Sequence, residues 1–143
     1  MRSQPERGSI LVEVVFLMVL LILPVFYLVG TLGRLQAGAY AVSASVREAG
    51  RAYATAPEAE QAPARAASAA RLVLESHGFT AQEGSITVTC DLDPCPQPGA
   101  AVRVAGSVRV ELPMIPDFAS GVVPTSVELT ASHLESVDEF REP

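Results

Sequence analysis

The apolar residues divide the chain into one long apolar segment and a mixed region after it. No residue from Val14 to Gly33 is charged, and about 20 such residues cross the hydrocarbon core of a bilayer as a helix. Beyond this segment, apolar residues recur at spacings of three and four as far as Tyr53, which is typical of a helix. The pattern predicts one helix over residues 9–56, about 70 Å long, with residues 10–33 spanning a membrane.

A second helix is predicted after a polar break. Ala62 and Pro63 open another helical pattern, which continues to His77. Proline suits the first turn of a helix. Gly78 is placed to cap the helix C-terminus, and Phe79 to make the apolar contact that accompanies such caps.

From Ser85 onward the period changes to two. Apolar and polar residues alternate over residues 85–92, 102–112 and 127–132, which predicts an antiparallel meander with one covered face. Gly106, inside the second strand, marks either a bulge or a close packing contact.

These elements predict an α+β fold. A long N-terminal helix, whose lower half spans the membrane, and a second helix pack on a small three-stranded antiparallel sheet. The predicted divisions are a leader (1–8), the long helix (9–56), a head of helix and sheet (57–134) and an acidic tail that frays (135–143).

Charge bears on partners and orientation. The net charge is −6, and all ten basic residues are arginine, so a nucleic-acid partner, which requires a basic surface, is not expected. Arg2 and Arg7 precede the apolar segment, and Arg34 follows it. The positive-inside rule then places the N-terminus in the cytoplasm and the head outside. A retained anchor is favoured over a cleaved secretory signal, because the apolar segment exceeds a signal core.

The candidate chemistry of the head is sparse. Cys90 and Cys95, in an extracytoplasmic head, are predicted to form a disulfide, with a pair of free thiols as the alternative. Cys-x4-Cys without a nearby histidine is a weak metal site. His77 and His133 are far apart in sequence, and no glycine-rich phosphate loop is present. We therefore expect neither an enzyme nor a metal or cofactor site.

Glu13 is the one charge inside the apolar region. A carboxylate at membrane depth costs about 2.5–3.5 kcal/mol, and such residues usually mark function. Its carboxylate could instead extend to the headgroups, since only a few residues separate Glu13 from the charged leader. Glu13 is, however, the fifth residue after Gly8, at the border between that leader and the apolar helix. This spacing favours a functional role.

These residues resemble the processing motif of type IV pilins. In that motif a prepilin peptidase cuts after a glycine, and a glutamate stands at the fifth mature position of an apolar helix. The stretch from Arg7 to Glu13, with small residues continuing through Gly50, looks like TadE-type minor pilins of the tight-adherence (Flp) pilus system. The resemblance covers residues 5–56. Two features depart from it: Pro24 lies later in the apolar run than is usual, and Val14 replaces the tyrosine of major Flp pilins.

The resemblance implies a set of roles. Gly8 and Ser9 would form the cleavage site, and Glu13 would attract the N-terminal amine of a neighbouring subunit. The implied partners are a prepilin peptidase, the major and other minor pilins, and the pilus assembly platform of the inner membrane. The alternative is an unprocessed single-pass membrane protein whose outer domain binds a partner or ligand.

Overall fold

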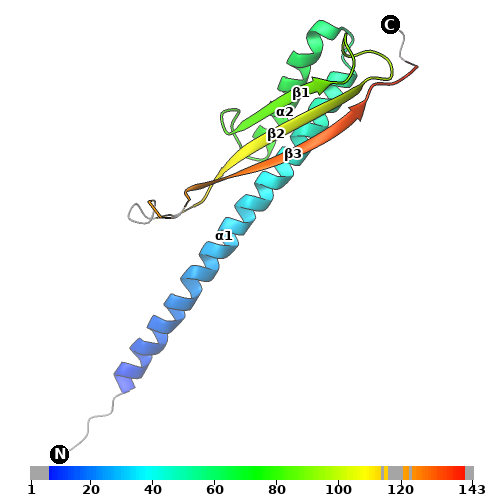
Figure 1. Ribbon diagram of the computed structural model, residues 1–143. Helices are drawn as coiled ribbons and strands as arrows, with labels where there is room; N and C mark the ends of the chain where they lie inside the picture. The colour runs from blue at the N-terminus through cyan, green and yellow to red at the C-terminus, as the bar shows by residue number, and fades with distance from the viewer. Residues whose placement is uncertain (1–6, 114, 116–120, 123, 141–143) are drawn as a thin grey trace, which may run out of the picture.

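The computed structural model describes residues 7–113, 115, 121, 122 and 124–140. It confirms the predicted α+β fold: a long helix leads into a head made of a second helix and a three-stranded antiparallel sheet (Figure 1). The strand order is β1-β2-β3. The elements are α1 (Arg7–Ala54), η1 (Ala59–Gln61), α2 (Ala62–Ser76), β1 (Gly84–Cys90), β2 (Ala101–Glu111) and β3 (Ser126–Ser136).

Helix α1 is continuous over 48 residues and passes through Pro24 without interruption. It begins at Arg7, inside the predicted leader, and ends at Ala54, two residues before the predicted end. At this end, the backbone N–H and the hydroxyl of Thr55 both donate to the Arg51 carbonyl, at 3.0 and 2.7 Å. A hydroxyl that occupies a late helix carbonyl competes with further helix formation, and Pro57 follows.

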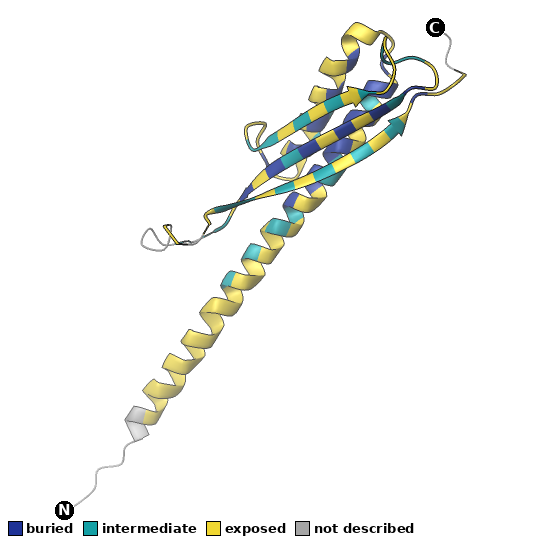
Figure 2. Ribbon diagram, in the orientation of Figure 1, coloured by how far each residue is buried: buried dark blue, intermediate teal, exposed yellow. Residues whose placement is uncertain are grey.

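The head has two layers. The upper half of α1 covers one face of the sheet over β2 and β3, α2 packs on α1 and reaches β1, and the other face is open to solvent (Figure 2). β2 shows this most clearly, because its residues alternate between buried and exposed along the strand. This is the pattern of a central strand with one covered face. The fully buried apolar residues of the sheet are the valines Val102, Val104, Val108 and Val110.

Glycines allow α1 and the sheet to approach closely. A side chain at Gly106 would put its Cβ 2.7 Å from Val46 Cγ1, and one at Gly38 would put it 2.5 Å from Val110 Cγ2. β2 keeps a regular register through Gly106 on both sides. Of the two predicted readings of Gly106, the close packing contact is therefore confirmed.

Small residues also join the two helices. α1 and α2 are in contact, and the buried residues along α2 are Ala62, Ala66, Ala70 and Leu74. The predicted C-terminal cap is confirmed: Gly78 has φ +79°, its N–H donates to Glu75, and Phe79 N–H donates to Leu74, both at 3.0 Å. Phe79 then turns into the core, as this cap motif favours.

β3 is longer than predicted. It continues through Glu135 to Ser136, so the prediction of a tail beginning at residue 135 was wrong. Val137 explains the extension: its side chain is buried, and its N–H donates to the Ala100 carbonyl at 2.8 Å. Polar residues at 133 and 135 hide this continuation in the sequence. Residues 141–143 of the predicted tail lie outside the described residues.

Candidate functional site

The predicted processing site lies at the start of α1. Gly8 and Ser9 belong to its first turn, and residues 1–6 of the predicted leader lie outside the described residues. Glu13 lies four residues beyond Ser9, about 6 Å along the helix axis. Positions four apart share one side of a helix. The amine that a cut would create and the Glu13 carboxylate therefore lie at the same end and on the same side.

Glu13 is exposed on a bare apolar surface. Its neighbours Val12 and Val14 are also exposed, and among the described residues no hydrogen bond or ion pair reaches the carboxylate. The charge of Glu13 therefore needs a partner from outside this chain's head. An ammonium group would offset much of the cost of a carboxylate in lipid.

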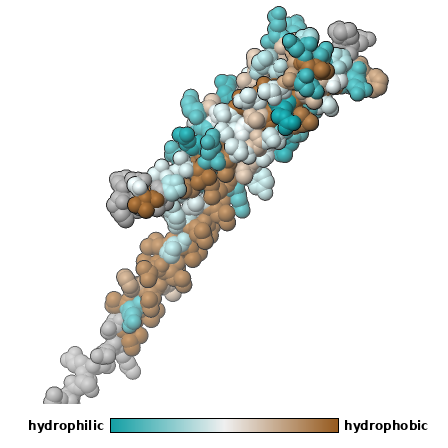
Figure 3. Space-filling view, in the orientation of Figure 1, coloured by the Kyte–Doolittle hydropathy of each residue, from teal (hydrophilic) through white to brown (hydrophobic). Residues whose placement is uncertain are grey.

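The lower half of α1 carries no covering layer. Large apolar side chains from Ile10 to Phe26 are exposed on all sides of the helix, which appears as an apolar stalk below the head (Figure 3). Within the described part of the chain, this is the one helix long and apolar enough to cross a membrane. Its most apolar window has a mean hydropathy of 2.8, and none of that window is buried. A helix that is apolar all round needs lipid or other protein around it.

Arg34 marks the junction between the stalk and the head. Its guanidinium carbon lies 5.5 Å from the centre of the Phe79 ring, within the range of a cation–π contact. Phe79 belongs to a cluster of buried apolar residues that also contains Val42 and Val110. The first charge after the apolar segment is therefore held by the head.

A short turn beside Arg34 joins α2 to β1. The Thr80 backbone N–H and hydroxyl donate to the Glu83 carboxylate at 2.6 and 2.8 Å. These two hydrogen bonds lower the pKa of Glu83, desolvation opposes them, and the positive charge of Arg34 adds to the lowering. Hydrogen bonds to the ionised form have this effect. The end of the head nearest the stalk thus holds an ionised carboxylate and an arginine.

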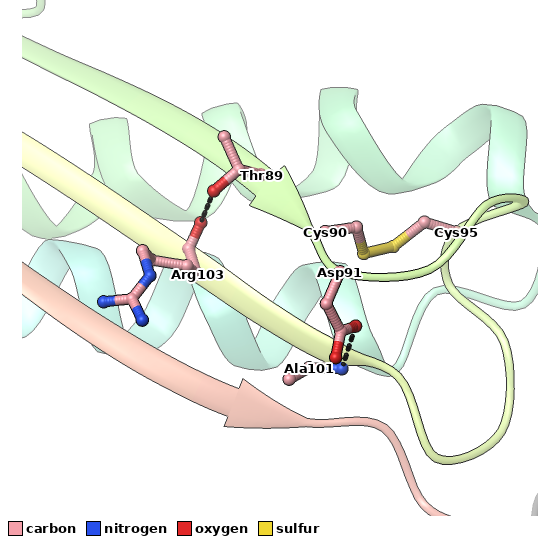
Figure 4. Close-up of a disulfide and its surroundings, with 6 residues drawn as sticks. All are labelled: Thr89, Cys90, Asp91, Cys95, Ala101 and Arg103. Atoms are coloured by element: carbon pink, nitrogen blue, oxygen red, sulfur yellow. Dashed lines mark hydrogen bonds between the residues drawn. A yellow bond between two sulfur atoms is a disulfide. The ribbon is translucent and has the colours of Figure 1, made fainter.

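The disulfide lies at the other end of β1. Cys90 and Cys95 are bonded, with their Cα atoms 6.4 Å apart, and they close the turn that follows the strand (Figure 4). Asp91 supports the same turn, because its carboxylate accepts from Ala101 N–H at 2.7 Å. Of the two sequence alternatives, the structure contains the disulfide, and none of the described cysteines is free.

The two histidines lie apart in the fold. His77 is exposed at the end of α2, where Nδ1 lies 2.9 Å from the Val73 carbonyl. His133 lies on β3, with Nε2 3.0 Å from the Glu135 carboxylate. The described residues contain no group of three or more potential metal ligands. Each histidine therefore has a local structural contact.

The exposed face of the sheet carries a shallow hollow of about 480 Å³. Its walls are small, and Ser85 Oγ lies 2.9 Å from Ser107 Oγ across β1 and β2. None of the lining residues is titratable: Ser85, Thr87, Ala105, Gly106, Ser107, Thr130, Ala131 and Ser132. A serine without a base beside it is a weak nucleophile, so this hollow offers no catalytic group among its lining residues.

Sequence reasoning missed the contacts of the junction. Arg34 and Phe79 are 45 positions apart, and their contact depends on how α2 returns the chain to α1. The Thr80-to-Glu83 spacing resembles a capping box and was the one available signal. The pairing of His133 with Glu135 could have been found from alternation, since both residues share one face of a strand.

Comparisons with known proteins give no relatives. No protein-family model matches the chain, and no curated protein and no solved structure matches it.

Proposed function

We propose that this chain is a minor pilin or pseudopilin of the TadE type. It is anchored in the cytoplasmic membrane, cut after Gly8 by a prepilin peptidase, and acts in assembly or initiation of a tight-adherence pilus. The observation that supports this most is the continuity of α1. One unbroken helix connects the Gly8-to-Glu13 motif, through an uncovered apolar stalk, to a small disulfide-bonded head.

The bare stalk supports a role in assembly. Its apolar side chains are uncovered over the whole length that a membrane would surround. If the chain leaves the lipid for a filament, those side chains must be covered by equivalent helices of other subunits, because exposing them to water is unfavourable. Major and minor pilin subunits and the inner-membrane assembly platform are the partners of this step.

The proposed role of Glu13 follows from its position. Cleavage after Gly8 gives Ser9 a positively charged amine. When a new subunit enters beside an older one, the Glu13 carboxylate of one chain and the Ser9 amine of the other can pair in a medium of low dielectric constant, where such a pair is strong. Breaking a buried pair by removing one partner is costly, so this contact sets the axial position of the incoming helix.

The proposed orientation places the N-terminus in the cytoplasm. Arg2 and Arg7 lie before the apolar segment, while the head has a disulfide that persists in oxidising compartments. Gly8 then lies on the cytoplasmic side, where the prepilin peptidase is expected to act.

Mass spectrometry of the protein purified from membranes tests the cut directly. We expect a mature N-terminus at Ser9 when a prepilin peptidase is present, and the full leader when it is absent. Gly8→Ala should block the cut. Gly30→Ala is the matched control, since it lies in the same helix with nothing within 4 Å of the added Cβ, and it should be processed normally. A mature N-terminus still at Met1 would favour the unprocessed single-pass alternative.

A second pair of variants tests Glu13. Glu13→Ala should be cut normally but should strongly reduce piliation, because the amine of the neighbouring subunit loses its partner. Glu13→Asp keeps the charge and should retain part of the function. Normal piliation by Glu13→Ala would refute the pairing role and leave the processing site standing.

A further inference from the structure

Among the described residues, each outer strand of the sheet has one unpaired edge. β1 and β3 each pair with β2 alone, and β3 keeps one regular register with β2 over all 11 of its residues. Natural edge strands are usually protected by prolines, bulges, lysines or short length. β3 has no proline, lysine or bulge and is 11 residues long, and its one inward-pointing carboxylate, Glu135, lies near its C-terminal end. It is a long, regular template for another strand.

The hydrogen bonds between β2 and β3 show which backbone groups of β3 lie at its free edge. Leu112 N–H donates to the Thr125 carbonyl at 2.9 Å, and Val137 N–H donates to Ala100 at 2.8 Å. In an antiparallel pair, bonded residues alternate with residues whose N–H and C=O point away. The even-numbered residues of β3 therefore present their backbone groups to the open edge. The exposed residues of this set are Glu128, Thr130, Ser132, Leu134 and Ser136.

The free edge of β1 lies beside an apolar hollow. Arg109 N–H donates to Glu83 and Asp91 N–H donates to Ala101, so Ile86 and Val88 direct their backbone groups outward. Between this edge and α2 lies a hollow of about 240 Å³. Its apolar lining includes Ala67, Ala70, Leu74 and Ile86. A strand added to β1 would place the side chains of its inner face in this hollow.

Membrane anchoring restricts how two copies can meet. β1 and β3 are both antiparallel to β2, so they run in the same direction, and the sheet lies along α1 (Figure 1). Two copies in one membrane have parallel α1 helices, so their outer strands also run parallel. A two-fold axis compatible with both anchors lies along the strands. Two β3 strands related by that axis would have N–H groups opposite N–H groups and C=O groups opposite C=O groups. No backbone hydrogen bonds would then form between them.

We propose that β3 of one copy pairs in parallel with β1 of a second copy of this chain, which extends the sheet head to tail. This inference rests on the membrane anchoring of the proposed function. The half-buried inner-face side chains Leu129 and Ala131 pack on their own core, and in this pairing they border the neighbour's hollow beside Ile86. Each such pair of copies leaves one free β1 edge and one free β3 edge. The contact is therefore heterologous and continues as an open series.

Cross-linking of the full chain in its membrane tests this arrangement. Thr87→Cys on β1 and Thr130→Cys on β3 place thiols on the outer face of the sheet, and the native cysteines are occupied by their disulfide. With a short bis-maleimide, the double variant should give a ladder of dimers, trimers and higher species. Each single variant should stay monomeric. A dimer from Thr130→Cys alone would indicate two-fold pairing and overturn the proposal. Because the two thiols of a double variant line the same hollow and can be joined within one chain, the deciding sample is Thr87→Cys chains expressed with differently tagged Thr130→Cys chains. Mixed dimers are expected from it, and their absence would overturn the proposal.

Blocking variants separate the two edges. Ser132→Pro removes an outward N–H of β3, at an edge where proline is tolerated, and should abolish the ladder, whereas Ser132→Ala should keep it. Ala67→Arg fills the hollow beside β1 and should also abolish the ladder. Its control is Ala64→Arg, equally exposed on α2 but outside this hollow. If Ser132→Pro lowers the protease resistance of the head, a second variant repeats the test. It carries Thr130→Pro as the blocking change and Ser132→Cys as the thiol on β3.

Complementation gives the sharpest outcome. Chains with Ser132→Pro keep a working β1 edge, and chains with Ala67→Arg keep a working β3 edge. Expressed together with different tags, they should form mixed dimers and no longer species. Absence of mixed dimers would overturn head-to-tail pairing. The two proposals can fail separately. If the parent chain is not cut, but Gly8→Ala chains, which stay anchored, still give the ladder, only the processing is refuted. If the parent chain is cut but gives no ladder, only the edge pairing is refuted.

Discussion

The two halves of α1 form one continuous helix with opposite surroundings. From Ile10 to Leu32 the Val, Leu, Ile, Met and Phe side chains are exposed, whereas above Gly33 one side of the helix is buried against the sheet and α2. The lower half is composed of bulky Val, Leu, Ile and Phe, and the upper half mainly of Ala, Gly, Ser and Val. Side-chain size separates the half that is long and apolar enough to cross a membrane from the half that other elements of the chain approach.

The reason lies in the distance between backbones. Small residues let a helix come close to its neighbour, and the upper half uses this at Gly38 and Gly50, whose absent Cβ atoms would face β2 and β3. The lower glycines, Gly30 and Gly33, have nothing within 4 Å. The same residue type therefore has a packing role in one half and none in the other.

The largest expected effect comes from a charge in the lower half. Leu20 and Leu72 are almost equally exposed, at 60% and 62%, but Leu20 would face lipid and Leu72 faces water. Leu20→Arg should weaken membrane insertion by about 3 kcal/mol, seen as loss of protein from the membrane fraction. Leu72→Arg should leave that fraction unchanged. Equal behaviour of the two variants would contradict the membrane assignment.

A bulky residue in the upper half should have the next largest effect. Gly38→Leu drives a side chain into Val110 and Leu129, and such overpacking costs about 1–3 kcal/mol. Thermal unfolding of the head in detergent should shift to lower temperature. Gly30→Leu, in the same helix, should leave the transition unchanged. If both variants unfold alike, the close approach of α1 to the sheet is not needed for stability.

The smallest effect concerns pH and the turn at the junction. Because the pKa of Glu83 is lowered in the folded head, its ionised form stabilises the fold at pH above the ordinary pKa of a glutamate, and this contribution is lost as the pH falls through the lowered pKa. Glu83→Gln should remove that part of the acid sensitivity, by less than about 1 kcal/mol. Glu60→Gln, in η1 and outside this turn, should retain the wild-type profile between pH 7 and 3.

Most of the fold could be predicted because it follows from the periodicity of apolar residues along the sequence. The α1 continuation, the glycine-capped α2 and the alternating strands each show a local pattern that burial then reproduces. The prediction of where β3 ends was wrong for the same reason, since His133 and Glu135 occupy inward positions where the pattern required apolar residues. They pair with each other there, and Val137 resumes the apolar alternation two residues later.

The candidate site divides in a similar way. Gly8, Ser9 and Glu13 are close in sequence, so their spacing on a helix follows from the helical repeat alone. The Cys90–Cys95 pair is also local, and the structure contains the predicted bond. The Arg34–Phe79 contact was not predictable, because it depends on which distant segments become neighbours. The edge positions of the first and third strands, in contrast, follow from the predicted meander.

The sequence by itself determined a long apolar helix, a motif at its start and a head with helical and strand periods, because these are properties of neighbouring residues along the chain. Only the tertiary structure decided which face of the sheet α1 covers, how Gly106 admits Val46, and how α2 borders the hollow beside β1. Those outcomes depend on contacts across tens of residues, where side-chain volume and backbone hydrogen bonding, rather than local pattern, select the arrangement.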